Sequence, residues 1–240
     1  MNKKIYAVAL AIFIVMPLLA AAATLRAQAQ STTISLIDQS VTAQTHTYFY
    51  DKIGTTINLT LYVQDVSSLW SWKVNMTWDS SMLQLAPANN VTEGPFLSSN
   101  GASTTLFIEA PPTPGNIPEL SSTLLENTSV SGSGALATIS FTVLNYGNTT
   151  INITDARLLN PAGTDITTIA PISNPIELRL PGDVDGNNVV NMADVIAALK
   201  AFGSYPGSPR WNPAADINSL GKIDMGDVIA ILIHFGQHYP

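Results

Sequence analysis

The last quarter of the chain contains one sequence unit written twice, and this duplication is the strongest constraint on what the chain can fold into. Residues 183–203 read DVDGNNVVNMADVIAALKAFG, and residues 216–236 read DINSLGKIDMGDVIAILIHFG. The copies lie 33 residues apart without an internal gap and share nine identities at that offset, namely Asp183, Met192, Asp194, Val195, Ile196, Ala197, Leu199, Phe202 and Gly203. Such a period indicates two copies of one small supersecondary unit that pack against each other.

Each copy opens with oxygen donors at alternate positions, which is the arrangement that a hard cation requires. The calcium loop of an EF-hand supplies oxygens from positions 1, 3, 5, 7, 9 and 12, with a backbone carbonyl at position 7. In the first copy these positions hold Asp183, Asp185, Asn187, Val189, Asn191 and Asp194. In the second copy they hold Asp216, Asn218, Leu220, Lys222, Asp224 and Asp227. We therefore predict two Ca²⁺ sites, the second weaker or completed by water because Leu220 has no side-chain oxygen.

The turn and the helix of each unit can also be predicted. Position 6 is Asn188 in the first loop and Gly221 in the second, and both residue types tolerate the left-handed backbone that a sharp bend needs. Gly203 and Gly236 are expected to end the helices. Apolar residues with helical spacing precede these stops, and we expect the two helices to bury them together: Val195, Ile196, Leu199 and Phe202, then Val228, Ile229, Leu232 and Phe235.

A calcium loop followed by one helix, duplicated, with aspartate at position 12, resembles the type I dockerin module. The resemblance covers residues 182–240 and departs from the family at Asn188, at Leu220 and in the long connection 204–215. Dockerins contact a partner cohesin through positions 10 and 11 of each loop. The resemblance therefore implies a cohesin as partner, bound in either of two orientations through Met192, Ala193, Met225 and Gly226. The alternative is that both methionines are core residues.

The beginning of the chain has the pattern of a signal peptide, predicted over residues 1–29. Lys3 and Lys4 precede an uncharged run from residue 5 to residue 25, and Ala27-Gln28-Ala29 is a small-residue cleavage site. The run is 21 residues long, so an uncleaved membrane anchor is the alternative. In both cases the rest of the chain is expected outside the cytoplasm, secreted or at the cell surface. Because the chain has no cysteine, it has no disulfides, and core packing and bound metal must hold it.

Residues 31–180 are predicted to form an all-β domain. Short stretches rich in Val, Ile, Thr and aromatic residues indicate strands at 56–63, 70–78, 104–108, 135–144 and 149–154, and loops are expected at Pro111–Pro118 and Glu126–Ser133. About 150 residues of this kind indicate one β-sandwich or jelly roll. The predicted fold class is thus a mainly β sandwich, followed at residues 181–240 by a small α module of two calcium loop-helix repeats.

The β region resembles a cohesin, the module that dockerins bind. The resemblance is carried by the strand after Gly54, by the stretch 72–79 leading to Met82 and Leu83, by 134–141, and by 149–155 followed by 160–166. It implies that the sandwich serves as a receptor or carrier for a dockerin. A chain with both kinds of module could associate with copies of itself, or bridge an enzyme to a surface within polysaccharide-degrading assemblies.

Composition and motifs argue against catalysis and against nucleic acid. No HExxH, GxSxG or P-loop pattern is present, and the three histidines, His46, His234 and His238, fit surface or tail positions. Without residues 1–29 the chain has seven basic and 17 acidic residues, a net charge of about −10, which disfavours nucleic-acid binding. We therefore expect a non-catalytic assembly or adhesion protein.

Two alternatives for the function remain open at this point. In the first, Trp70, Trp72 and Trp78 form a sugar-stacking surface and the sandwich binds polysaccharide, although packing in the core is favoured for these rings and Trp211 is expected on the helix pair. In the second, the tail caps the sandwich of a structural surface protein. The sandwich also contains six candidate glycosylation triplets, at Asn58, Asn75, Asn90, Asn127, Asn148 and Asn152.

Overall fold

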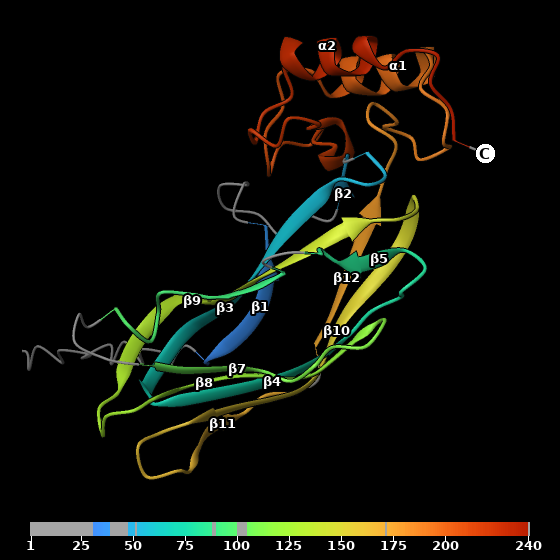
Figure 1. Ribbon diagram of the computed structural model, residues 1–240. Coiled ribbons are helices and arrows are strands. Elements are labelled where there is room, and N and C mark those ends of the chain that lie inside the picture. Colours follow the sequence, from blue (N-terminus) through green and yellow to red (C-terminus); the bar gives the residue numbers. More distant parts are fainter. Residues whose placement is uncertain are drawn as a thin grey trace, which may run out of the picture. The chain divides into compact units, whose positions relative to one another are not determined.

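The computed structural model describes residues 31–38, 48–50, 52–87, 90–99, 105–170 and 172–239 (Figure 1). The predicted leader and His46 lie outside these residues. Residues 31–240 form one unit by their internal contacts. In the part of the chain that is described, no helix is both long enough and apolar enough to cross a membrane.

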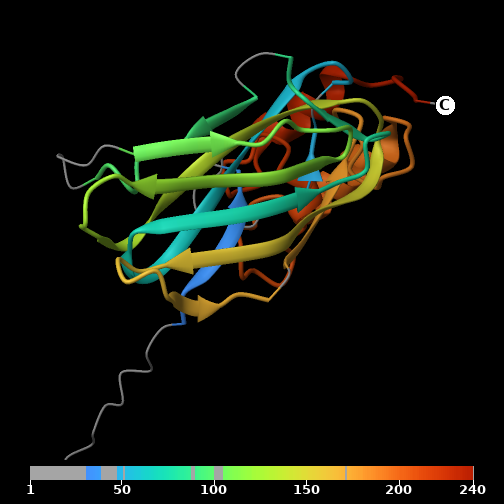
Figure 2. The same ribbon diagram turned by 60° about the horizontal axis from the view of Figure 1, so that its bottom comes forward.

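Two sheets make up the first part of this unit. The first sheet contains, in spatial order, β1 (Thr33–Ile37), β3 (Thr56–Leu69), β9 (Val130–Val143) and β5 (Leu83–Leu85), with β6 (Val91–Glu93) also paired to β9. The second contains β2 (Tyr48–Phe49), β12 (Ile172–Leu178), β10 (Gly147–Leu159), β4 (Ser71–Thr77), β8 (Asn116–Leu124) and β7 (Thr105–Glu109), with β11 (Asp165–Thr168) paired to β10. Figure 2 shows β7, β8, β4 and β10 side by side. Only the β2–β12 pair is parallel among these strands.

Alternation of side chains along the strands produces the core between the sheets. On β4, Trp72, Val74 and Met76 are buried while Lys73 and Asn75 on the opposite face are half-buried. Successive residues of a strand point to opposite faces, so one apolar row per strand is enough to fill the interior. The prediction of a mainly β sandwich is confirmed.

Two predicted loops are shorter than expected. The segment Pro111–Pro118 was expected to be irregular throughout, yet β8 begins at Asn116 and contains Pro118. The pairing of β8 with β4 shifts register between Val74 and Met76, opposite this proline, and a bulge is where a sheet tolerates a residue without an N–H. The predicted loop Glu126–Ser133 is also too long, because β9 already begins at Val130.

The C-terminal part contains two short α-helices and one 3-10 turn. They are α1 (Met192–Ala201), η1 (Pro213–Ala215) and α2 (Met225–Ile233). Their apolar residues form a cluster separate from the sandwich core, and Trp211 packs against it as predicted. Gly203 and Gly236 follow the helices with φ of 77° and 85°, which confirms them as helix stops.

The prediction that the helices bury all their apolar residues together is wrong. Val195 and Val228 are buried, but the other members of the two predicted faces are 38–51% exposed: Ile196, Leu199, Phe202, Ile229, Leu232 and Phe235. The contact between the helices is instead completed by smaller or neighbouring side chains, Ala198, Ala201 and Ile231. Helices of ten and nine residues have room for only a narrow buried stripe.

Candidate functional site

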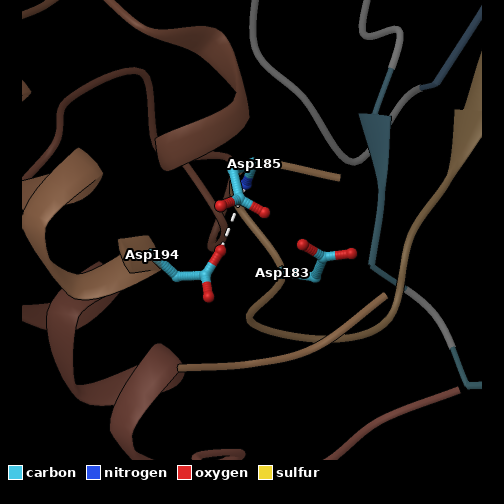
Figure 3. Close-up of side chains that lie close together, drawn as sticks. All are labelled: Asp183, Asp185 and Asp194. Atoms are coloured by element: carbon cyan, nitrogen blue, oxygen red, sulfur yellow. Dashed lines mark hydrogen bonds between the residues drawn. The ribbon is translucent and has the colours of Figure 1, made fainter. Parts of the chain in front are cut away.

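The first loop brings three carboxylates together ahead of α1. Asp183, Asp185 and Asp194 each offer an oxygen within 4.8 Å of the others (Figure 3). The backbone holds two of them in place: Asp183 accepts hydrogen bonds from the amides of Gly186, Asn187 and Asn188, and Asp194 accepts them from Val184 and Asp185. The loop therefore wraps around the side chains of its first and twelfth positions.

Burial and charge make this cluster suitable for a cation. Asp183 and Asp194 are fully buried, and none of the salt bridges found among the described residues involves either of them or Asp185. Burial raises the pKa of Asp185, and the neighbouring carboxylates of Asp194 and Asp183 raise it further. Buried carboxylates of like charge are costly unless a positive charge is shared among them, and hard oxygen ligands of this kind suit Ca²⁺.

The other two side-chain ligand positions of the first loop are Asn187 and Asn191, which accept hydrogen bonds from backbone amides two residues further on. Asn187 is exposed and Asn191 is half-buried. Asn191 is the N-cap of α1, where it accepts a hydrogen bond from Ala193 N at 2.7 Å. Asp194 completes a capping box by accepting from Asn191 N at 2.8 Å. Asn188 has a φ of 64°, as predicted for the turn position. Val189 is the position expected to supply a carbonyl, and its side chain is exposed.

The second loop repeats this arrangement with one gap. Asp216 accepts from the amides of Leu220 and Gly221, and Asp227 accepts from Asn218 and Asp224. Burial raises the pKa of Asp216, and Asp227 and Asp224 add to the shift against the opposing effect of the two amides. Leu220 is 75% exposed, and Lys222 is an exposed side chain at the carbonyl position. The two loops thus share carboxylates at positions 1 and 12, but the third carboxylate is at position 3 in the first loop and at position 9 in the second, which also lacks a side-chain oxygen at position 5.

The residues implied as partner contacts lie at the surface. Met192 and Met225 are each 55% exposed, and Ala193 and Gly226 beside them are exposed. The alternative that both methionines are core residues is therefore wrong. The sequence interpretation missed the neighbours that extend this surface along each helix, because helical periodicity was taken as a sign of burial. We call six of these exposed apolar residues the apolar helix face: Met192, Ile196, Leu199, Met225, Ile229 and Leu232.

The tryptophans of the sandwich are mostly core residues, as favoured. Trp72 is 1% exposed and lies 6.3 Å from the Phe107 ring. Trp78 is 8% exposed, packs edge-on against Phe141 and donates its indole N–H to Leu83 O. It also lines a pocket of about 300 Å³. Trp70 is half-buried and donates to Glu126 O at 3.1 Å. Trp72 and Trp78 therefore cannot form a flat exposed stacking surface.

The glycosylation candidates differ in accessibility. Asn58, Asn127 and Asn148 are exposed, whereas Asn75, Asn90 and Asn152 are half-buried. The amide oxygen of Asn75 is buried without a hydrogen-bond partner, and that of Asn152 accepts from Ser173 Oγ. Of the two described histidines, His238 is exposed and His234 is half-buried at the end of α2.

Comparisons with known proteins agree with the architecture of the first part of the chain. A family model described as the cohesin domain matches residues 26–176, which end before the two loop-helix repeats. Cellulosomal-scaffolding protein B and cellulosomal-scaffolding protein A of Acetivibrio thermocellus are each 30% identical to the chain over 82 residues, or 34% of its length. That stretch is only 10% and 4% of the lengths of those two proteins.

Several solved structures have a similar sandwich. A type II cohesin domain from the cellulosome of Acetivibrio cellulolyticus is 15% identical, with 61% of this chain and 95% of that chain covered at a TM-score of 0.46. The sixth cohesin of scaffoldin B from the same organism, solved in complex with a dockerin, is 12% identical, with 62% and 99% covered at a TM-score of 0.46. A non-cellulosomal cohesin from Archaeoglobus fulgidus is 12% identical, with 52% and 82% covered at a TM-score of 0.40.

Proposed function

Because the chain belongs to the cohesin family through residues 26–176, we propose that it is an exported assembly protein that binds partners through two modules. The cohesin module is a non-catalytic docking domain of the scaffold type. In this proposal the sandwich receives a dockerin of another protein. The C-terminal module carries Ca²⁺ in its two loops and docks on a cohesin.

The apolar helix face is the observation that carries this proposal. Three apolar side chains on α1, Met192, Ile196 and Leu199, are 45–55% exposed, and their counterparts on α2 are 49–55% exposed. On each helix these three residues have the spacing i, i+4 and i+7, which places them on one side of the helix. Exposed apolar patches mark interaction sites, and methionine adapts to irregular partners. Because the same residues recur at the same register, the face offers a partner two near-equivalent ways to bind.

Calcium would act on this face through the start of each helix. Asp194 and Asp227 each occupy position 12 of their loop, and each is also the N3 residue of the following helix, where it completes the capping box. A cation held by these carboxylates fixes the N-terminus of the helix that presents Met192 or Met225. The predicted ligands fit the ion in type and spacing, with the second site weaker because of Leu220.

The setting proposed is extracytoplasmic, either secreted or on the cell surface. The signal-peptide pattern of residues 1–29 supports export. The two curated relatives are named as cellulosomal scaffolding proteins, which supports a place in polysaccharide-degrading assemblies. Direct polysaccharide binding is not part of the proposal, because Trp72 and Trp78 are core residues.

A second candidate function, an intramolecular cap on the sandwich, is favoured by contacts of the module with the β region. The Tyr50 hydroxyl donates to Ala214 O, and the rings of Tyr146 and Tyr239 pack edge-on at 4.9 Å. If capping is the main role, deletion of residues 181–240 should lower the melting temperature of the sandwich strongly. An unchanged melting temperature would leave docking as the role of the module.

The docking proposal is tested with the full chain in Ca²⁺ and in EDTA, by calorimetric titration against recombinant cohesin modules and by sedimentation of the chain alone across concentration. We expect Ca²⁺-dependent binding that Leu199→Asp with Leu232→Asp weakens at least about tenfold, because an apolar contact is replaced by a desolvated charge. Leu125→Asp, at an exposed leucine of the sandwich, is the matched control. Binding that is absent for every cohesin, including that of a second copy, would contradict the proposal.

A further inference from the structure

One arginine of the β region reaches into the first loop. Arg179 directly follows β12 and is only 9% exposed. Its Nε and Nη2 donate to Glu177 Oε1 at 2.8 and 2.7 Å. Its Nη1 donates to the carbonyl oxygens of Val184 and, at 3.4 Å, of Asp183. These are the first two residues of the loop, so the guanidinium ties the last strand of the sandwich to the beginning of the candidate metal site.

The arginine also explains the residue at the fourth position of the loop. A Cβ at Gly186 would lie 3.1 Å from Arg179 Nη2 and 3.3 Å from Glu177 Oε1. Gly186 therefore lets the loop backbone pack closely against the Arg179–Glu177 pair. The second repeat differs at both places: Asn212 stands where the first repeat has Arg179, and Ser219 stands where it has Gly186. Asn212 instead caps η1 by accepting from Ala214 N.

The later residues of the first loop are bonded to the last described residues of the chain. Val190 N donates to Gln237 O at 2.9 Å, Gly236 N donates to Val190 O at 2.8 Å, and Tyr239 N donates to Asn188 O at 2.9 Å. The Tyr239 hydroxyl in turn donates to Asn145 Oδ1 at 2.6 Å, next to Tyr146. The first loop is thus bonded to Arg179 at its first two residues and to residues 236–239 at its sixth and eighth residues.

We infer that Arg179 is a positioning residue for the first calcium loop, and that the β region and the loop share one metal-linked folding equilibrium. The inference rests on the proposed function of the loop. Arg179 holds the carbonyls of Asp183 and Val184 in place in the calcium-free loop. Less conformational entropy of the loop backbone is therefore lost when calcium binds. Glu177 balances the guanidinium charge, so the cation is not opposed by a net positive neighbour. By linkage, calcium in the first loop must stabilise the Arg179 contacts in return.

The test is Ca²⁺ titration of the full chain by calorimetry, with Arg179→Met and Arg179→Lys each placed in two backgrounds. The Asp216→Ala background disables the second site, so that the titration reports on the first. The Asp183→Ala background disables the first site, so that the titration reports on the second. We expect Arg179→Met to weaken the first site about tenfold, as loss of a partner outside the ligand shell commonly does, and to leave the second site unchanged. Arg179→Lys keeps the charge but cannot span Glu177 and both carbonyls, so an intermediate loss is expected. Arg157→Met, at an exposed arginine, is the matched control.

The outcomes separate this inference from the proposed function. Selective weakening of the first site, together with a smaller calcium-induced rise in melting temperature, supports it. An unchanged first site in Arg179→Met, or equal losses at both sites, overturns it while the calcium module stands. A wild-type chain that binds no calcium at either loop overturns the metal assignment and the inference with it.

Discussion

The first loop has Gly186 and Asn188 at its fourth and sixth positions, whereas the second has Ser219 and Gly221 there. All four have positive φ, at 76°, 64°, 57° and 74°, so the two loops follow the same backbone path although glycine stands at a different place in each. Backbone shape is set locally by the carboxylates at positions 1 and 12. The choice of glycine is set by the surroundings, because only the first loop packs against an Arg–Glu pair.

The two loops also differ in how completely their ligands are supplied. The first has a side-chain oxygen at every position that needs one, and three of its carboxylates lie within 4.8 Å of one another. The second has Leu220, 75% exposed, at position 5. Of the two proposed calcium sites, the first therefore has the more complete ligand set and contacts Arg179, and the second has the less complete set. Each loop is followed by the same apolar helix face.

The largest change in calcium affinity is expected when the residue at position 1 of a loop is replaced, and comparing the two loops in this way tests the difference between them. Asp183→Ala should weaken the first proposed site by about a hundredfold or more, because its buried carboxylate is the first ligand of that site in our proposal and also accepts three backbone amides. Asp216→Ala should cost less affinity overall, since it removes a site that is already weak. Calcium titration by calorimetry, with melting temperature followed in parallel, measures both. Equal losses would mean that the loops do not differ in strength.

A gain of function should come from repairing the second loop. Leu220→Asn supplies the missing oxygen at position 5, and we expect the affinity of the second site to rise about tenfold. Leu220 is already exposed, so little packing is lost. The measurement is the same titration in the Asp183→Ala background, with Leu125→Asn as a control at another exposed leucine. An unchanged second site would show that position 5 does not limit it.

Exchanging the residues at the fourth loop position, glycine for serine in the first loop and serine for glycine in the second, should change the unfolding free energy by unequal amounts. Gly186→Ser places a Cβ on a left-handed backbone and against Arg179, so a loss of about 1–2 kcal/mol in unfolding free energy is expected. Ser219→Gly should change stability by no more than about 0.5 kcal/mol, because relief of backbone strain is offset by the greater freedom of glycine in the unfolded chain. Chemical denaturation of the calcium-free protein gives both values, and equal losses would remove the role assigned to the arginine.

These comparisons also show which features were accessible from the sequence. The left-handed Asn188 and the helix stops at Gly203 and Gly236 depend on residues close in the chain, so the sequence pattern predicts them. The calcium ligands stay a prediction. The exposure of Ile196 and Leu199 was missed because periodicity marks an apolar stripe without saying how much of it a partner helix covers. The inclusion of Pro118 in β8 depends on a bulge opposite Val74 and Met76. Arg179 bonds to Glu177, Asp183 and Val184, which are two to five residues away in the chain, but a lone arginine ahead of such a loop has no spacing pattern that would single it out.

The smallest expected effect is the pH dependence of the calcium-free protein. Burial and the neighbouring carboxylates raise the pKa of Asp185 above its ordinary value of 3.8, and burial with Asp227 and Asp224 does the same for Asp216. A carboxyl whose pKa is raised by folding binds its proton more tightly in the folded state. Stability is therefore gained at acidic pH and lost as the pH rises from about 4 through the raised pKa.

Calcium should reverse this trend, because protons and the cation compete for the same oxygens. Melting temperatures between about pH 3.5 and pH 7, in EDTA and in Ca²⁺, should therefore slope in opposite directions. In EDTA, Asp185→Asn should reduce the dependence of the melting temperature on pH by the contribution of the first loop. Asp216→Asn should reduce it by the contribution of the second loop. Since Asp185 is exposed at the loop surface while Asp216 is buried, the second substitution should have the larger effect on this slope. Parallel slopes with and without calcium would show that the ion does not bind at these carboxylates.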